Sequence, residues 1–262
     1  MIHTFPAEPD GNRYEVNGLA LLNNELYVLC REDEQQVDIH STTDFALLRQ
    51  ITVEGTDGVQ DIAACAQKQC IYLFDFDIHR LGLDGSVTKW SVDMQIMTAR
   101  VTPSSDLIVI CYEEDDEGYF SYVPYVISSE TGDCLRRFLP QLLENKFLLE
   151  DCMQLSDDCY VVCYPSANGG RLCRVDGQGR IVRSSRDDVR MKLPTRIAMD
   201  GDNFTFVADQ KKCCVLLFDP VLDFVCNVTE GLDVCPRRMV YDEVTRRLYM
   251  DQDSANVIVV QL

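Results

Sequence analysis

The sequence predicts an all-β protein, a six-bladed β-propeller of four-stranded blades in which residues 1–262 form a single domain. Three observations predict this fold class. A pair of apolar runs recurs six times along the chain, turn signals follow most of the pairs, and the runs are continuous instead of alternating. Continuous apolar runs are typical of strands that are covered on both faces, as strands are between packed blades.

Each repeat combines a short apolar run, a turn of mostly polar residues and a stronger apolar run with an aromatic or branched residue at its centre. The paired runs are 19–22 and 26–29, 62–65 and 71–74, 99–102 and 107–110, 152–155 and 160–163, 196–200 and 206–209, and 238–242 and 248–251. Their central residues are Tyr27, Tyr72, Ile108, Tyr160, Phe206 and Tyr249, with spacings of 45, 36, 52, 46 and 43 residues. These spacings bracket the ~40–45 residues of a propeller blade.

A second pair of strands is expected in the other half of most repeats. The turn signals that indicate it lie at 83–86, 129–133, 175–179 and 218–220. Asp-Gly and Thr-Gly between apolar runs are typical of hairpins, because glycine adopts the positive φ that tight turns require. Each repeat therefore has four predicted strands.

The ring is expected to close through the N-terminal segment. The last repeat ends with the apolar run 257–262, one strand short of a blade, and residues 2–5 can supply the missing outer strand. Such closure leaves no open sheet edge. One stretch, 139–148, has leucine and phenylalanine at helical spacing; we expect a loop and a first strand there, with a short helix as the alternative.

Two of the repeats carry a recognisable motif. Residues 194–200 are a proline-led apolar strand, 206–209 read Phe-Val-Ala-Asp, and 215–220 read Val-Leu-Leu-Phe-Asp-Pro. This segment resembles an NHL repeat, and residues 236–251 resemble it less closely. The resemblance implies a six-bladed propeller like the C-terminal propeller of tripartite-motif proteins, which binds protein or RNA. The chain lacks the cysteine–histidine arrays of RING and B-box modules.

Charge and composition narrow the choice of partner. Lys and Arg number 24 against 43 Asp and Glu, a formal net charge of −19. A protein with this much negative charge repels phosphate backbones and anionic lipids. We therefore expect neither nucleic acid nor a membrane as partner. No run of 18 apolar residues and no export signal is visible, and thirteen cysteines are an odd number in a large chain. We expect a monomeric cytoplasmic domain with reduced cysteines in its core.

Motifs for catalysis are absent from the sequence. It contains no glycine-rich phosphate loop, no Gly-x-Ser-x-Gly elbow and no His-Glu-x-x-His helix. The three histidines, His3, His40 and His79, fall in expected outer strands. The sequence therefore favours a non-catalytic interaction scaffold that binds a protein or peptide through one face of the propeller.

A ring of charged residues is the first candidate binding site. The residues that precede the first apolar strand of each repeat are Gly18, Asp61, Arg100, Asp151, Arg196 and Arg238. First strands line the channel of a propeller, so these residues are expected at similar height around its mouth. The arginines either pair with Asp61 and Asp151 or offer guanidiniums to a carboxylate or phosphate of a partner. Arg237 adds positive charge at this face.

An acidic and aromatic loop is the second candidate. It comprises Glu113, Glu114, Asp115, Asp116 and Glu117, followed by Tyr119 and Phe120. Most such runs are solvated hairpins. A functional loop of this composition would bind a basic segment of a protein partner through charge and aromatic contact.

A metal-dependent hydrolase is the alternative function. The chain also resembles, more distantly, the senescence-marker and gluconolactonase family, whose six-bladed members hold one divalent cation in the channel with Glu, Asn and Asp. That resemblance would make Glu15, Asn17 and Asp151 candidate ligands for calcium or a similar cation. Where that family usually has a Pro-Asn-Gly ligand this chain has Arg196, whose charge opposes a cation, so we expect no cofactor.

Overall fold

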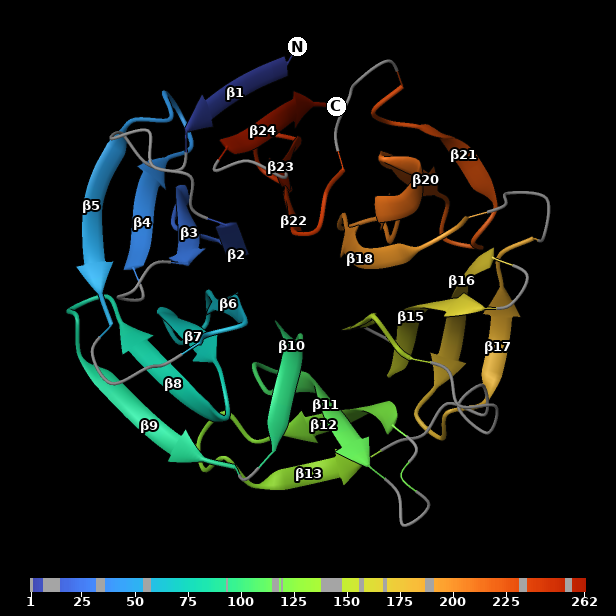
Figure 1. Ribbon diagram of the computed structural model, residues 1–262, viewed down its shortest axis with the longest axis horizontal. Helices are drawn as coiled ribbons and strands as arrows, with labels where there is room; N and C mark the ends of the chain where they lie inside the picture. The colour runs from blue at the N-terminus through green and yellow to red at the C-terminus, as the bar shows by residue number, and fades with distance from the viewer. Residues whose placement is uncertain are drawn as a thin grey trace.

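The protein is a ring of six β-sheets around a central channel (Figure 1). The computed structural model describes residues 2–6, 15–31, 36–53, 58–92, 94–114, 118, 120–137, 148–155, 158–166, 169–186, 191–230, 235–252 and 256–262. Within these residues, 24 strands form six sheets of four antiparallel strands each. The predicted six-bladed β-propeller is confirmed.

Every blade has the same order of strands from the channel to the rim (Figure 1). The first strands are β2 (Glu15–Leu22), β6 (Asp61–Cys65), β10 (Gln95–Val101), β14 (Asp151–Gln154), β18 (Pro194–Met199) and β22 (Met239–Asp242). The second strands are β3 (Glu25–Arg31), β7 (Cys70–Phe74), β11 (Leu107–Glu114), β15 (Cys159–Ser166), β19 (Thr205–Asp209) and β23 (Arg247–Gln252). The third strands are β4 (Gln36–Ser41), β8 (Asp77–Gly82), β12 (Phe120–Ile127), β16 (Gly169–Asp176), β20 (Cys214–Phe218) and β24 (Asn256–Gln261). The outermost strands are β5 (Leu47–Thr52), β9 (Val87–Ser91), β13 (Cys134–Arg137), β17 (Ile181–Ser184), β21 (Phe224–Asn227) and β1 (Ile2–Pro6).

The second strands form the core. Their predicted central residues all lie on these strands and are at most 3% exposed. The core clusters join neighbouring blades: Tyr27 of blade 1, for example, belongs to the same cluster as Ile71 and Leu73 of blade 2. Each sheet is covered on its two faces by the two neighbouring blades. The strands are therefore apolar at successive positions, as the sequence predicted.

Strand β1 closes the ring between blade 6 and blade 1. It pairs antiparallel with β24, from Ile2 opposite Val260 to Pro6 opposite Asn256. Phe5 is 8% exposed and stacks on Phe45 of blade 1 with ring centroids 5.2 Å apart. The predicted closure by residues 2–5 is confirmed, and the two chain ends lie side by side in Figure 1.

Two cysteines differ from the prediction that all thirteen are reduced. Cys213 of blade 5 and Cys235, which leads into blade 6, form a disulfide. They are 22 residues apart, and the packing of adjacent blades brings them together. The remaining eleven are free; eight are buried, whereas Cys134 and Cys226 are exposed on the outermost strands. The prediction of reduced core cysteines is therefore wrong for Cys213 and Cys235, which are bonded, and for Cys134 and Cys226, which are exposed.

Three smaller expectations have different outcomes. His3 lies on an outermost strand, but His40 and His79 lie on third strands and are buried, so their predicted position is wrong. The possible helix at 139–148 falls almost wholly outside the described residues. The described part of the chain contains no helix that is both long and apolar enough to cross a membrane.

Phe5→Ala should lower the free energy of unfolding by about 3–5 kcal/mol, because it removes the buried contact of the closing strand. Urea denaturation followed by circular dichroism measures this change. Ile2→Ala is the matched control on the same strand; Ile2 is 48% exposed, and we expect a change within about 0.5 kcal/mol. Equal changes in the two variants would contradict a stabilising role for β1.

Alkylation of the denatured protein without reductant should label 11 thiols, and alkylation after reduction should label 13. Intact-mass spectrometry counts the labels. Labelling of all 13 without reductant would show that Cys213 and Cys235 are not bonded in the protein as purified.

Candidate functional site at the mouth of the channel

Charged side chains from several blades meet at one end of the channel. The first strand of every blade begins at this face, which we call the mouth face. The side chains that interact there through hydrogen bonds, ion pairs or charge, which we call the mouth cluster, are those of Asp61, Thr98, Arg100, Asp151, Arg196 and Arg238. The mouth cluster therefore includes all five charged residues that the sequence placed in the ring, together with a threonine that it did not.

Asp61 and Asp151 each fasten one blade to the next. In both residues Oδ1 accepts the amide of the following residue, at 3.0 Å from Ile62 N and 2.9 Å from Cys152 N. Their Oδ2 atoms accept amides of the next blade, Ala99 N at 3.3 Å and Ile197 N at 2.9 Å. Both aspartates are at most 1% exposed. These main-chain hydrogen bonds orient the two carboxylates independently of the arginines.

Arg100 and Arg196 neutralise these carboxylates. Arg100 Nη2 lies 2.6 Å from Asp151 Oδ2, and its Nη1 lies 3.6 Å from Asp61 Oδ2. Arg196 Nη2 lies 3.3 Å from Asp61 Oδ2, and Arg196 Nη1 donates to the hydroxyl of Thr98. The Asp61–Arg196 pair joins blade 2 to blade 5 across the channel. The structure thus brings these residues together mainly as internal ion pairs, the first of the two roles considered from the sequence.

Arg100 does not occupy the ring position that comparison of the six repeats predicted for it. A β-bulge precedes Gly18 in β2, Thr98 in β10 and Arg196 in β18, which makes these three residues equivalent. Arg100 therefore lies two residues further along the channel. The comparison of the six repeats took Val101 as the first apolar residue of this strand, whereas Ala99 follows Thr98 as Leu19 follows Gly18, and for that reason it missed Thr98.

The remaining ring positions lie at the contact between blades 1, 2 and 6. A Cβ atom on Gly18 would stand 2.8 Å from Ile62 Cγ1, so this position is closely packed against blade 2. Arg238 donates through Nε to the main-chain oxygen of Asn17 and through Nη2 to that of Gln60 at 3.0 Å. Within the described residues, no carboxylate lies within the 4.0 Å of an ion pair from Arg238.

Burial and the neighbouring charges shift the pKa values of residues in the mouth cluster. Burial raises the pKa of Asp61, but Arg196, Arg238 and Arg100 outweigh burial and hold it below 3.8. Burial lowers the pKa of Arg100, yet Asp151 and Asp61 outweigh it and the pKa is raised. Arg238 differs: burial and the Arg196 guanidinium lower its pKa to about 10. Positive charge is therefore poorly compensated at Arg238.

Arg237 and Arg238 are held in place by Asp251 at the end of the second strand of blade 6. Asp251 Oδ1 accepts the amide of Arg237 at 2.6 Å and that of Arg238 at 2.7 Å. Burial raises the pKa of Asp251, although these amides and the two arginines oppose the shift. The Arg237 side chain is 45% exposed and lies 3.3 Å from Glu15. A pair this exposed contributes at most about 1 kcal/mol.

The described part of the acidic loop also lies on the mouth face. Glu113 and Glu114 end β11, Phe120 begins β12, and Asp115, Asp116, Glu117 and Tyr119 lie outside the described residues. Glu113 accepts hydrogen bonds from Arg137 Nη2 at 2.7 Å and from the Tyr125 hydroxyl. Phe120 is 47% exposed and stacks on Tyr112 at 5.0 Å. Glu113 is thus held by its own blade, whereas Phe120 offers an exposed aromatic surface.

The candidate metal ligands make other contacts. The Asn17 side-chain amide donates to Val59 O at 3.0 Å, Glu15 lies against Arg237, and Asp151 carries the Arg100 guanidinium. A cation held by Asp151 would lie beside that guanidinium, which repels it.

One group of potential metal ligands is found in the described residues, away from the mouth cluster. Its members, Asp75, Asp77 and His79, have ligand atoms within 4.8 Å of one another. The Lys89 ammonium lies 2.6 Å from Asp77, and its charge opposes a bound cation.

Comparisons with known proteins extend the fold assignment. No protein-family model and no curated protein matches the sequence. Among solved structures, the chain is similar to selenomethionine-substituted virginiamycin B lyase from Staphylococcus aureus (TM-score 0.69, 10% identity, 100% of this chain and 99% of that one). It is also similar to a catalytically inactive variant of that enzyme with quinupristin (0.68, 9%, 100% and 99%) and to Kuenenia stuttgartiensis hydrazine synthase (0.66, 14%, 95% and 84%). At these identities the likeness shows the fold alone, and NHL membership stays a prediction.

Asp61→Asn should lower the free energy of unfolding at pH 7 by about 3–5 kcal/mol, because it leaves guanidiniums buried without their carboxylate. The Asp61 carboxylate stabilises the fold fully above its unfolded pKa of 3.8, and this stabilisation is lost as the pH falls through the lowered folded pKa. The difference between variant and wild type should therefore shrink below pH 3.8. Urea titrations at several pH values measure it.

Asp158→Asn is the matched control, because Asp158 is 62% exposed and pairs with Arg136 at the surface. We expect a change below about 1 kcal/mol at pH 7. A similar loss in both variants would contradict a structural role for the mouth cluster.

Proposed function

We propose that the protein is a non-catalytic interaction module that binds a protein or peptide partner on its mouth face. The observation that carries the proposal is that Arg238 has main-chain oxygens but no carboxylate as hydrogen-bond partners in the described residues and lies next to exposed Arg237. A carboxylate or phosphate of a partner would supply the missing negative charge and accept the planar guanidinium fork.

The contacts narrow the surface that a partner would use. Arg100 and Arg196 serve the buried aspartates, and the Arg196 side chain is only 4% exposed. Neither is suited to direct contact with a protein. Asp251 accepts the amides of the adjacent residues Arg237 and Arg238. The backbone of this pair, which we call the Arg237–Arg238 corner, is therefore held in place without a partner.

We expect the partner to carry its acidic residues in one short segment. The protein carries a net charge of −19, so a strongly acidic partner would be repelled at long range. A short segment with one or two anionic groups gains the attraction of the Arg237–Arg238 corner with little of that repulsion.

Arg237→Glu should weaken binding of a fluorescein-labelled peptide with a Phe-Asp-Glu sequence by tenfold or more, because it reverses the charge of the corner. Fluorescence anisotropy at low and physiological salt measures the effect, and salt should weaken binding to the wild type. A peptide in which Asn and Gln replace the acids should bind the wild type weakly.

Arg180→Glu is the matched control. Arg180 is exposed and pairs with Asp176, in the β16–β17 turn of the opposite face. This variant has the same change of net charge and should bind the peptide like the wild type. Equal affinity of Arg237→Glu and Arg180→Glu variants would move the site away from the mouth face.

A further inference from the structure

A cavity occupies the channel beyond the mouth cluster. Its volume is about 230 Å³, and the first strands of all six blades line it. The residues on its wall are those that follow the ring positions along each strand, so the cavity extends from the mouth cluster toward the opposite face. Ligand pockets for drug-sized molecules hold roughly 300–1,000 Å³, which makes this cavity suitable for a smaller molecule.

The side chains on the cavity wall are apolar apart from the Arg100 guanidinium and the Tyr241 hydroxyl. Leu21, Val101, Met153, Met199 and Tyr241 line it and are each only half-buried, so apolar surface is left uncovered inside the channel. Covering such surface is favourable by roughly 25 cal/mol per Å². Methionine side chains also adapt their shape to a ligand.

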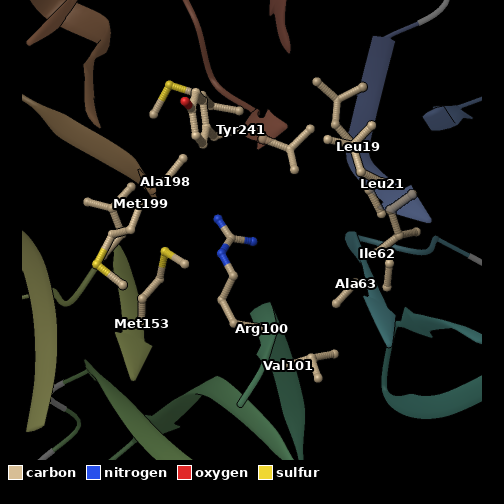
Figure 2. A pocket seen from close by; sticks show the side chains of 15 residues that line it. Leu19, Leu21, Ile62, Ala63, Arg100, Val101, Met153, Ala198, Met199 and Tyr241 are labelled. Carbon is tan, nitrogen blue, oxygen red and sulfur yellow. The ribbon is translucent and has the colours of Figure 1, made fainter. Parts of the chain in front are cut away.

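Arg100 is the charged residue of this wall. Figure 2 shows its guanidinium at the centre of the cavity, surrounded by the apolar side chains. Its position two residues beyond Thr98, which occupies the ring, places it there. In the described structure its hydrogen bonds go to Ala99 O from Nη1 and to Asp151 from Nη2. Nη1 also lies 3.6 Å from Asp61 Oδ2, so the Nε–H and one N–H of Nη2 remain for a ligand.

The charges around Arg100 favour an anion. Arg100 and Arg196 pair with the carboxylates of Asp61 and Asp151 within 4.0 Å, and in the described residues Arg238 pairs with neither. Glu150 and Asp251 are the other acidic groups that interact with these arginines, and no described contact within 4.0 Å joins them to the guanidiniums. The Nε of Arg196 is also buried without a hydrogen-bond partner in the described residues. A carboxylate in the cavity would accept hydrogen bonds from the N–H groups of Arg100 that face no protein acceptor.

We propose that the channel cavity binds a small apolar monocarboxylic acid, with its carboxylate on Arg100 and its hydrocarbon part along Leu21, Met153, Met199 and Tyr241. The ligand reaches the cavity from the face opposite the mouth, where these half-buried residues lie. A phosphate ester fits less well, because its second charge would remain unpaired against an apolar wall. This site is separate from the Arg237–Arg238 corner and does not depend on the proposed protein partner.

Isothermal titration calorimetry with octanoate tests the proposal. We expect saturable one-to-one binding with a Kd below about 1 mM, as ten non-hydrogen atoms with a charged anchor can provide. Octan-1-ol, which has the same chain without the charge, should bind at least about tenfold more weakly. Acetate, which has the charge without the chain, should not bind measurably. Equal binding of octanoate and octan-1-ol, or no binding of octanoate, would overturn the proposal.

Two variants locate the site. Met199→Trp fills the cavity from the end opposite Arg100 and should abolish octanoate binding, whereas Leu135→Trp, on the exposed outer strand β13, should not change it. The double variant Arg100→Gln/Asp151→Asn replaces the ion pair by a neutral pair and should weaken octanoate at least tenfold while leaving octan-1-ol unchanged. Circular dichroism verifies the fold of each variant. If Met199→Trp does not fold, the double variant decides; octanoate binding unchanged in a folded variant would overturn the proposal.

Discussion

Two buried aspartates at one end of the channel are the constraint on which the arrangement of charge in this propeller depends. Asp61 and Asp151 each accept two main-chain amides, one from their own strand and one from the following blade, and are then neutralised by arginines. A carboxylate buried to this degree is costly unless every lone pair is used. The amides and guanidiniums use them, and in doing so they join blades 2 to 5.

This network divides the channel into two environments. On its outer side, Arg237 and Arg238 lie near the surface with main-chain partners and one exposed carboxylate, so their charge can act on a macromolecule. On its inner side, Arg100 projects into the channel cavity, where a charge that is partly removed from water interacts more strongly than in bulk water. The protein partner and the small acid are therefore proposed for different sides of one cluster, each matched to its surroundings.

The same division reconciles the overall acidity of the protein with the two proposed sites for anions. The net charge of −19 is spread over the surface, where ions screen it within about 10 Å. Arginines in the channel are close to a ligand and partly removed from water, so their local attraction outweighs the distant repulsion. Long-range charge then limits how acidic a partner can be without preventing recognition of a single carboxylate.

The sequence by itself determined the fold. The six repeats, their aromatic centres such as Tyr27 and Tyr249, and the closing strand at residues 2–5 are local patterns of burial and turn chemistry, which the chain carries wherever its blades end up. It also identified the arginines and aspartates of the mouth. Only the tertiary structure decided their roles. Strand pairing puts Thr98 and not Arg100 in the ring, and the Asp61–Arg196 pair joins residues far apart in sequence. The bond between Cys213 and Cys235 likewise depends on how neighbouring blades meet, because no periodicity records which side chains face each other across a closed ring.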